Sequence, residues 1–245
     1  MIFIRCYLAR ASSVLYIMAV VALPGLSLDG HPNCYTSLGA HGVETHHCTK
    51  AEERIIYNPN QTLDGVSRSL MVSHKSCVVN VQKPKHLMPT KDTIERMVHN
   101  ITRACPSTGG VLLTSSNLMV YIYRATDHNT YEINKPRCEK KRCNISLDDC
   151  SNAMLALPVN QKGNLIGTEP GYYSANATRG NCTVKVITTD YALLRLTHQE
   201  ADASFRVLVN ECKDHPGDIF INGGTAGYNG DVRISIRGFG NHTCS

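Results

Sequence analysis

The sequence predicts an α+β fold in which one small, disulfide-stapled α/β sandwich occurs twice in tandem. Three observations predict it. The cysteines after the N-terminal apolar segment recur at similar intervals in both halves of the chain. In each half, one of these cysteines opens a valine-rich strand, and the next one closes an amphipathic helix. Two helices on one face of an antiparallel sheet would bury the apolar stripes of each half.

The N-terminal segment has the layout of a secretory signal peptide. Arg5 and Arg10 supply positive charge, and the apolar run that follows is broken by Pro24. Ser27 is a small residue suited to a cleavage site, and the apolar run is shorter than the roughly 20 residues that a membrane-spanning helix needs. We therefore expect residues 1–27 to be removed, the mature protein to be secreted and extracellular, and no stable membrane anchor to remain.

The mature chain keeps ten cysteines, which should form disulfides in an oxidising compartment. They divide into Cys34, Cys48, Cys77, Cys105 and Cys138 in the first half, and Cys143, Cys150, Cys182, Cys212 and Cys244 in the second. Because five per half is an odd number, one cysteine of each half is left for a possible disulfide between the modules. Spacing leaves the connectivity open; the pairs we favour are Cys77–Cys105 and Cys182–Cys212, with the bridge near the module ends.

The elements of the two halves correspond in order: helix, strand, helix, strand, strand. In the first half we expect helices at 49–57 and 92–105 and strands at 77–81, 110–114 and 118–123. In the second half we expect helices at 146–157 and 197–212 and strands at 182–186, 217–221 and 231–237. A glycine-rich turn, expected to be flexible, precedes the last strand.

The long helix of each half carries the clearest pattern. Asp92 with Glu95, and Thr197 with Glu200, are predicted capping boxes. The apolar stripes that follow match when Cys105 is superposed on Cys212; they consist of Ile94, Met97, Val98 and Ile101 in the first half, and of Ala201, Phe205, Leu208 and Val209 in the second.

These patterns divide the chain into a signal peptide (1–27), a first α/β module (28–138), a basic linker (139–142) and a second α/β module (143–245). Lys141 and Arg142 form a dibasic pair at this boundary, typical of sites that kexin-type and furin-type proteases cut. A solvated hinge is the alternative interpretation of the same pair.

Net charge and Asn-x-Ser/Thr sequons indicate the character of the protein surface. Without Arg5 and Arg10, the formal net charge falls from +5 to +3, which is too dispersed for the clustered basic footprint of a nucleic-acid-binding protein. Of six Asn-x-Ser/Thr sequons, those at Asn60, Asn100 and Asn176 are the predicted glycosylation sites.

The sequence contains no catalytic signature, so we predict no catalytic residue, no cofactor and no metal. His41, His46, His47 and Cys48 could hold a metal, but the counterpart of Cys48, Cys150, has no histidines near it, which indicates a structural role for the cysteine. The enzyme alternative is a secreted ribonuclease-type hydrolase; its candidate residues would be Tyr121, Tyr123, Arg124 and His128 in the first half, with Arg233 and Arg237 in the second.

The run SLDDCSNAMLALP, then GNCTVKV, then a helix ending in cysteine, a glycine-rich turn and a last strand, resembles small secreted fungal proteins. The two-subunit killer toxins of smut fungi, and killer-toxin-like effectors of plant-pathogenic fungi, look similar. The resemblance implies one precursor with a signal peptide, cut by a kexin protease into α and β subunits of related α/β-sandwich fold.

We therefore expect a secreted, non-enzymatic, cysteine-rich interaction protein that contributes to virulence or competition. Its partner would be an unidentified protein or glycan on the surface of, or outside, a host or competitor cell. Besides the ribonuclease-type hydrolase, a secreted immune decoy of a virus or parasite is an alternative.

Overall fold

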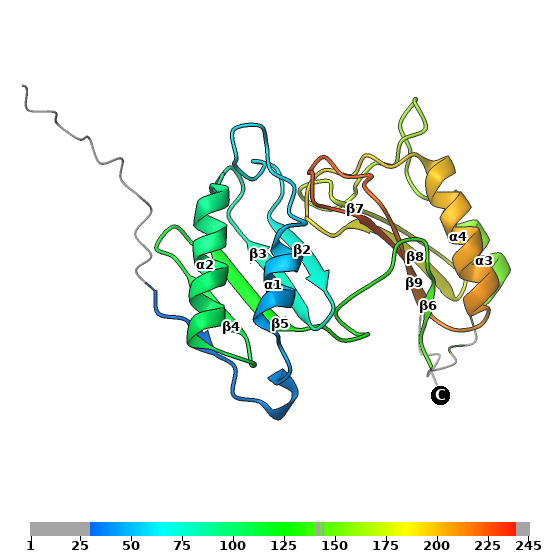
Figure 1. Cartoon of the computed structure of the whole chain (residues 1–245). Helices are drawn as coiled ribbons and strands as arrows, with labels where there is room; N and C mark the ends of the chain where they lie inside the picture. Colours follow the sequence, from blue (N-terminus) through cyan, green and yellow to red (C-terminus); the bar gives the residue numbers. More distant parts are fainter. Residues whose placement is uncertain (1–29, 141–142, 144, 239–245) are drawn as a thin grey trace, which may run out of the picture.

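The computed structural model describes residues 30–140, 143 and 145–238, and in this part of the chain two sheets each carry two helices (Figure 1). The first module comprises β1 (Asn33–Cys34), the 3₁₀ turn η1 (Leu38–Ala40), α1 (Thr45–Glu52), β2 (Ser69–His74), β3 (Cys77–Gln82), α2 (Lys91–Ala104), β4 (Gly110–Leu113) and β5 (Met119–Arg124). The second comprises β6 (Arg137–Cys138), α3 (Leu147–Leu155), β7 (Ser174–Arg179), β8 (Cys182–Thr188), α4 (His198–Cys212), β9 (Gly217–Ile221) and β10 (Val232–Gly238).

The two sheets have the same topology. The strand order is β1-β4-β5-β3-β2 in the first and β6-β9-β10-β8-β7 in the second, and all of these strand pairs are antiparallel. Each strand of one module therefore has a counterpart at the same place in the other. The predicted fold class, two tandem α/β sandwiches stapled by disulfides, is confirmed, and so is the internal repeat.

The helices pack on their sheets through the predicted stripes. All eight stripe residues of α2 and α4 are buried, and they form one apolar core per module with the helix-facing valines and isoleucines of the strands. The predicted capping box at Thr197 and Glu200 is present at the start of α4. Helix α2 begins earlier than expected, because the hydroxyl of Thr90 accepts the N–H of Thr93 and takes the capping role assigned to Asp92.

Strands β2 and β7 were missing from the prediction. Each is the edge strand of its sheet and forms a hairpin with the valine-rich strand that follows it. Their turns use backbone in the left-handed region, at Lys75 (φ 47°) and at Gly180 (φ 48°). Strand β7 has the sequence SANATR, whose inward side chains are alanines, so it lacks the branched apolar residues that mark a strand in a sequence.

The disulfides repeat with the fold, but not in the pairs that we favoured. Cys34–Cys105 and Cys138–Cys212 each tie the short first strand to the end of the long helix, with separations of 71 and 74 residues. Cys48–Cys77 and Cys150–Cys182 each tie the first helix to the start of the valine-rich strand, β3 or β8, with separations of 29 and 32 residues. The pairs Cys77–Cys105 and Cys182–Cys212 are therefore wrong.

The expected disulfide between the modules is absent among these four bridges, all of which lie within one module. That bridge was expected because Cys138 was assigned to the first module, which gave each module an odd number of cysteines. The structure places Cys138 in the second module, because β6 pairs with β9 and the Cys138 sulfur bonds to Cys212. Cys143 is also disulfide-bonded, whereas Cys244 lies outside the described residues. Cys34 and Cys138 are the true counterparts.

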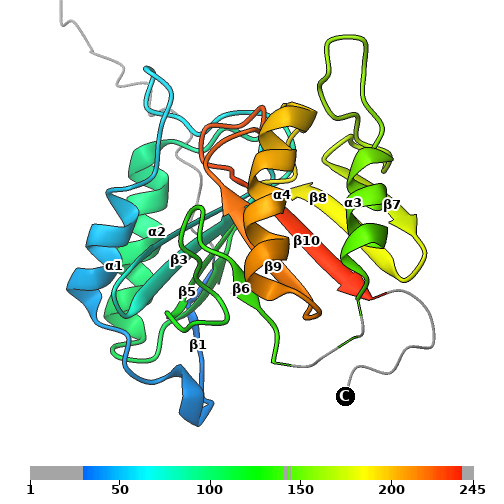
Figure 2. The ribbon, with the colours of Figure 1, turned by 90° about the vertical axis from the view of Figure 1, so that its right-hand side faces the viewer.

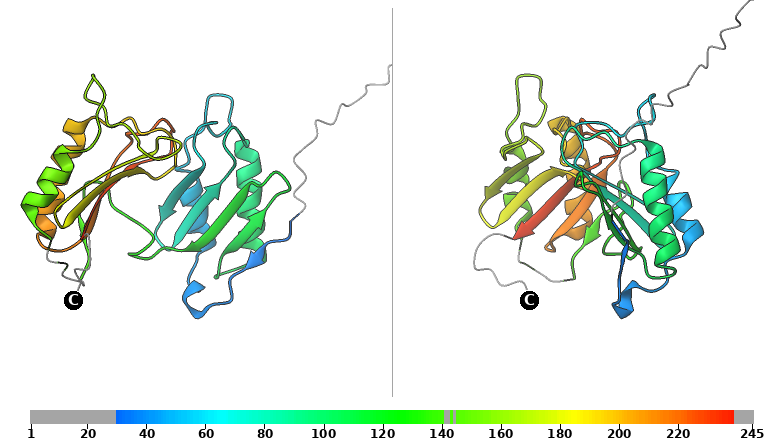
Figure 3. Two further views of the ribbon diagram at one scale, coloured as in Figure 1. Left: turned by 180° about the vertical axis from the view of Figure 1, so that it is seen from behind. Right: turned by 90° about the vertical axis from the view of Figure 1, so that its left-hand side faces the viewer.

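The modules face each other through the sheet faces that carry no helices. Helices α1 and α2 lie outside the first sheet and α3 and α4 outside the second, as the side view in Figure 2 and the rear view in Figure 3 show. The chain passes from β5 to β6 through residues 125–136, which lie between the two sheets (Figure 1).

Candidate binding cleft between the modules

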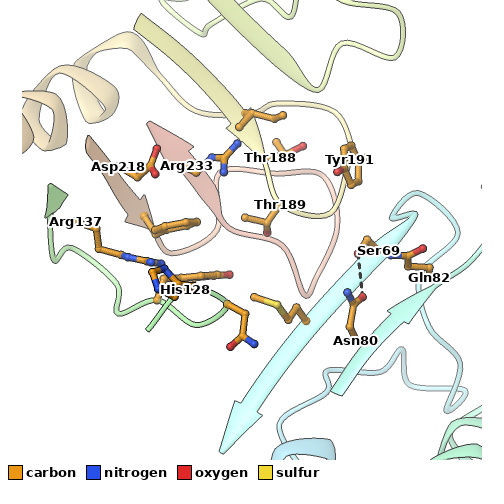
Figure 4. A pocket seen from close by; sticks show the side chains of 15 residues that line it. Ser69, Asn80, Gln82, His128, Arg137, Thr188, Thr189, Tyr191, Asp218 and Arg233 are labelled. Carbon is orange, nitrogen blue, oxygen red and sulfur yellow. Dashed lines mark hydrogen bonds between the residues drawn. The ribbon is translucent and has the colours of Figure 1, made fainter. Parts of the chain in front are cut away.

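A cleft of about 410 Å³ lies between the open faces of the two sheets (Figure 4). The alternation of side chains along a strand determines which residues line it. On β10, Val232 and Ile234 point into the core, so Arg233 between them points into the cleft. On β2 and β3, the lining residues are Ser69, Met71, Asn80 and Gln82.

The segment between the modules forms a third side of the cleft. The Tyr131 ring stacks on Phe220 of β9, with centroids 3.8 Å apart and planes 7° from parallel. Its hydroxyl donates to Asp231 at 2.8 Å, and burial together with that carboxylate raises the pKa of Tyr131. The N–H of Asn134 donates to the carbonyl of Phe220 at 2.7 Å. These contacts fix the segment against the second sheet.

The charges in the cleft are uneven. Arg137 donates to two neutral acceptors, the carbonyls of Thr130 (2.8 Å) and Asp127. Asp218 is bound by the Arg237 guanidinium at 2.9 and 3.0 Å, so its charge is already compensated. The positive charges that point into the cleft are therefore left without carboxylate partners among the described lining residues.

Asp190 holds the two modules together. Its carboxylate, which belongs to the second module, accepts the hydroxyls of Ser67 at 3.0 Å and Thr225 at 2.8 Å. Its carbonyl accepts the N–H of Arg68 at 2.9 Å. Burial raises the pKa of Asp190, although hydrogen bonds from Ala192, Thr225 and Ser67 oppose the shift. The position of the first module's β2 is thereby set relative to the second sheet.

The glycine-rich turn of the second module completes this junction. A side chain at Gly227 or Gly230 would collide with the Asp190 carboxylate, so the turn packs closely around it. Nearby, Asn229 donates to the carbonyl of Ile56 at 2.8 Å and accepts its N–H at 2.7 Å. The turn that we expected to be flexible is therefore part of a hydrogen-bonded interface.

The structure brings together two of the residues considered for a ribonuclease-type site. His128 and Arg233 both line the cleft (Figure 4). Tyr121 and Tyr123 lie half-buried on the open face of β5, outside the cleft lining. Arg237 is engaged with Asp218, and Arg124 lies beside Gly42 at the end of β5.

The histidine cluster lies at the start of α1, outside the cleft lining. Cys48 is in a disulfide and cannot serve as a ligand. The ligand atoms of Glu44, His46 and His47 lie within 4.8 Å of one another. The Nδ1 atom of His47 is 2.8 Å from the Ser76 hydroxyl, so this ring nitrogen is engaged in a hydrogen bond within the fold.

The predicted modification sites differ in their surroundings. Asn60 is exposed in a loop, Asn176 is exposed on β7, and Asn100 is half-buried on α2. Glycosylation at these asparagines stays a prediction. The dibasic pair Lys141–Arg142 and the predicted signal peptide, 1–27, lie outside the described residues.

The junction residue Asp190 and the cleft itself were not found by sequence reasoning. Asp190 occurs in the run TTDYALLRL, which has no motif, and its partners are Ser67 and Thr225, far away in sequence. The predicted repeat was the nearest available signal, because two sandwiches with open sheet faces have surfaces left to pack.

Comparisons with known proteins add a likeness in solved structures. No protein-family model and no curated protein matches the chain. The tandem DUF26 ectodomain of the Arabidopsis thaliana cysteine-rich receptor-like protein PDLP8 aligns with 14% identity and a TM-score of 0.28, over 85% of this chain and 95% of that one. The tandem DUF26 ectodomain of PDLP5, from the same plant, aligns with 12% identity and a TM-score of 0.27, over 85% and 96%.

At these TM-scores the likeness carries no argument about function. The tandem, disulfide-stapled architecture is established by the strand order and disulfides of this chain. Among the described residues, no helix is both long and apolar enough to span a bilayer.

Proposed function

We propose that this protein is a secreted, non-enzymatic recognition protein that binds an extracellular ligand in the cleft between its modules. The cleft is the observation that carries the proposal. Its volume of about 410 Å³ falls within the ~300–1,000 Å³ range of small-ligand sites. It is lined by both modules, so it exists only in the tandem arrangement.

The scaffold around the cleft supports this function. Disulfides are characteristic of oxidising, extracellular compartments, and the four bridges described tie each sheet to its helices. The Asp190 junction fixes one sheet relative to the other. A binding site that is set before the ligand arrives loses less conformational entropy on binding.

The side chains in the cleft favour binding over catalysis. General acid–base chemistry needs two titratable groups within reach of one another. Within the described residues, no hydrogen bond joins the His128 ring to a carboxylate, and Asp218 is occupied by Arg237. Every cysteine of the first module is in a disulfide and is not a nucleophile.

The test blocks the cleft without removing a hydrogen bond of the fold. Gln82 lies in the cleft wall on β3, and Gln82→Trp would fill part of the cavity. Gln161, exposed in a loop of the second module, gives the matched control Gln161→Trp. Labelled wild-type protein is applied to arrays of extracellular glycans and proteins and to intact cells. We expect Gln82→Trp to lose the binding that Gln161→Trp keeps; equal binding by both variants would refute the proposal.

The finer proposal is a killer-toxin-like fungal effector that acts at a host or competitor cell surface. It is supported by the sequence resemblance, the repeat and the dibasic pair, and the solved structures above are plant ectodomains instead. Purified protein would be added to cultures of competitor fungi and to plant tissue. Growth inhibition or altered immunity that Gln82→Trp abolishes would support this role, and full activity of that variant would separate it from the cleft.

A second candidate, a ribonuclease-type hydrolase, is favoured by one observation: His128 and Arg233 line the same cleft. An arginine could neutralise a phosphate while a histidine transfers a proton. The test is RNA degradation by the purified protein and by His128→Ala. Turnover that depends on His128 would replace the non-enzymatic proposal; background turnover in both proteins would remove this candidate.

A further inference from the structure

We propose that the ligand of the cleft is an acidic saccharide whose ring carboxylate is bound by Arg233. This inference rests on the proposed binding function and names the chemical class of its ligand.

The first observation is the unsatisfied state of Arg233. Its Nε atom is buried and has no hydrogen-bond partner, and no ion pair to its guanidinium occurs among the described residues. A buried donor without an acceptor is unfavourable and calls for an explanation, such as strain, a water or a bound ion. The guanidinium has the planar fork that matches a carboxylate in two parallel hydrogen bonds.

The second observation is that the neighbouring acid does not compensate this charge. Asp218, on β9, is held by Arg237 and also accepts the Ser235 hydroxyl. Arg137, the other arginine of the lining, donates to backbone carbonyls and keeps its charge. An anion that enters the cleft therefore meets two arginines and no free carboxylate among the described lining residues.

The third observation is the polar character of the walls. Asn80 and Gln82 on β3 carry amides, which donate and accept at once, as sugar hydroxyls require. Tyr131 and Tyr191 add aromatic surface. An extended acidic peptide is the competing ligand class, because β2, which carries Ser69 and Met71 of the lining, is an edge strand that a peptide backbone could pair with; the experiment therefore includes an acidic dipeptide.

The experiment compares two probes that differ in one group. Glucuronate and glucose, and separately an acidic dipeptide, are titrated into isotope-labelled protein at low ionic strength, and binding is followed by NMR chemical shifts. The variants are Arg233→Gln, Arg233→Lys and the control Arg206→Gln; Arg206 is exposed on α4 and pairs with Asp202. Thermal unfolding of each variant establishes that it is folded.

We expect glucuronate to bind about tenfold or more tightly than glucose, with shifts at the cleft residues. Arg233→Gln should lose this preference, Arg233→Lys should keep part of it, and Arg206→Gln should keep all of it. Raising the salt concentration should weaken glucuronate binding and leave glucose unaffected.

Four results would overturn the inference: no glucuronate binding at millimolar concentration, equal affinity for both sugars, an unchanged preference in folded Arg233→Gln, or tighter binding of an acidic dipeptide. The proposed function is judged separately. If Gln82→Trp abolishes surface binding while glucuronate fails to bind, the cleft recognises another ligand and only the acidic-saccharide assignment falls.

Discussion

Some buried polar side chains of this molecule have hydrogen-bond partners and others do not. Asp190 joins the modules with a carboxylate that accepts two hydroxyls and an N–H. Thr188 and Thr225 orient the loops around it. Glu52, in contrast, is the last residue of α1, and its Oε1 atom is buried without a hydrogen-bond partner. The first kind of group is satisfied and structural, and the second makes the stability of the first module depend on pH.

The carboxyl group of Glu52 has a pKa well above its usual range. Burial, and next the charge of Glu95, raise its pKa from 4.5 to about 7, against the opposing charge of Lys91. A folded pKa above the unfolded one means that this carboxyl stabilises the fold fully below about pH 4.5, and that the contribution is lost as the pH rises through about 7. The ionised form is therefore the destabilising one.

Glu52→Gln, which mimics the neutral acid, should raise the free energy of unfolding at pH 8 by about 1 kcal/mol, allowing for solvent screening of a half-buried group. At pH 4 the same substitution should change the free energy of unfolding little, because Glu52 is then neutral in the folded protein. Urea unfolding across this pH range measures both effects. The control is Glu132→Gln, because Glu132 is exposed, paired with Lys135 at 2.8 Å and absent from the charges that act on Glu52. A variant that is less stable than wild type at pH 8 would contradict the assignment.

The elements repeat between modules, but their ends are built differently. Helix α4 starts with a full capping box: the Thr197 hydroxyl accepts the Glu200 N–H at 3.2 Å, and the Glu200 carboxylate accepts the Thr197 N–H at 2.9 Å. At the start of α2, the Thr90 hydroxyl accepts the Thr93 N–H at 3.3 Å, without a returning carboxylate. The same helix is therefore capped more completely in the second module.

This difference in capping predicts a difference in the stability that each cap contributes. Thr197→Ala should cost about 1–2 kcal/mol and Thr90→Ala about 1 kcal/mol, because the first also removes the anchor of the Glu200 carboxylate. Amide hydrogen exchange in the first turn of each helix measures the effect locally. Thr197→Ser keeps the hydroxyl and should restore most of the protection. Equal loss in Thr197→Ser and Thr197→Ala would show that the methyl group matters instead of the cap.

The elements also show what the sequence could predict. The stripes of α2 and α4 and the strands β3, β4, β5, β8, β9 and β10 were readable, because their burial is periodic. The edge strand β7 was not, because its inward residues are alanines. The disulfide pairs were not either: the two-residue strands β1 and β6 carry Cys34 and Cys138, and such short strands leave no pattern in sequence.

At the scale of the whole molecule, the cleft depends on how two similar modules are oriented. That orientation is set by contacts between residues more than a hundred positions apart, such as Ser67 with Asp190. Local patterns do not record such contacts. The strand residues of the cleft, such as Arg233, could be predicted to lie on an open sheet face, but no local pattern places them beside His128 of the connecting segment.

The last prediction concerns the continuity of the chain. Lys141 and Arg142 lie between β6 and α3 in sequence, so they follow the first strand of the second module and do not separate the two modules. A cut after Arg142 would leave β6 on the N-terminal fragment. Cys138 would remain bonded to Cys212, and this disulfide, internal to the second module in the intact chain, would become the link between two chains.

If the pair is cut, the native secreted protein should show one mass without reductant and two masses after reduction. In the double variant Cys138→Ser with Cys212→Ser, the fragments should separate under denaturing conditions without any reductant, because the other three described bridges each lie on one side of the cut. Lys141→Ala with Arg142→Ala should give one mass throughout. A single mass from reduced wild-type protein would show that the chain stays intact, and the tandem scaffold would then act as one continuous polypeptide whose cleft needs no processing.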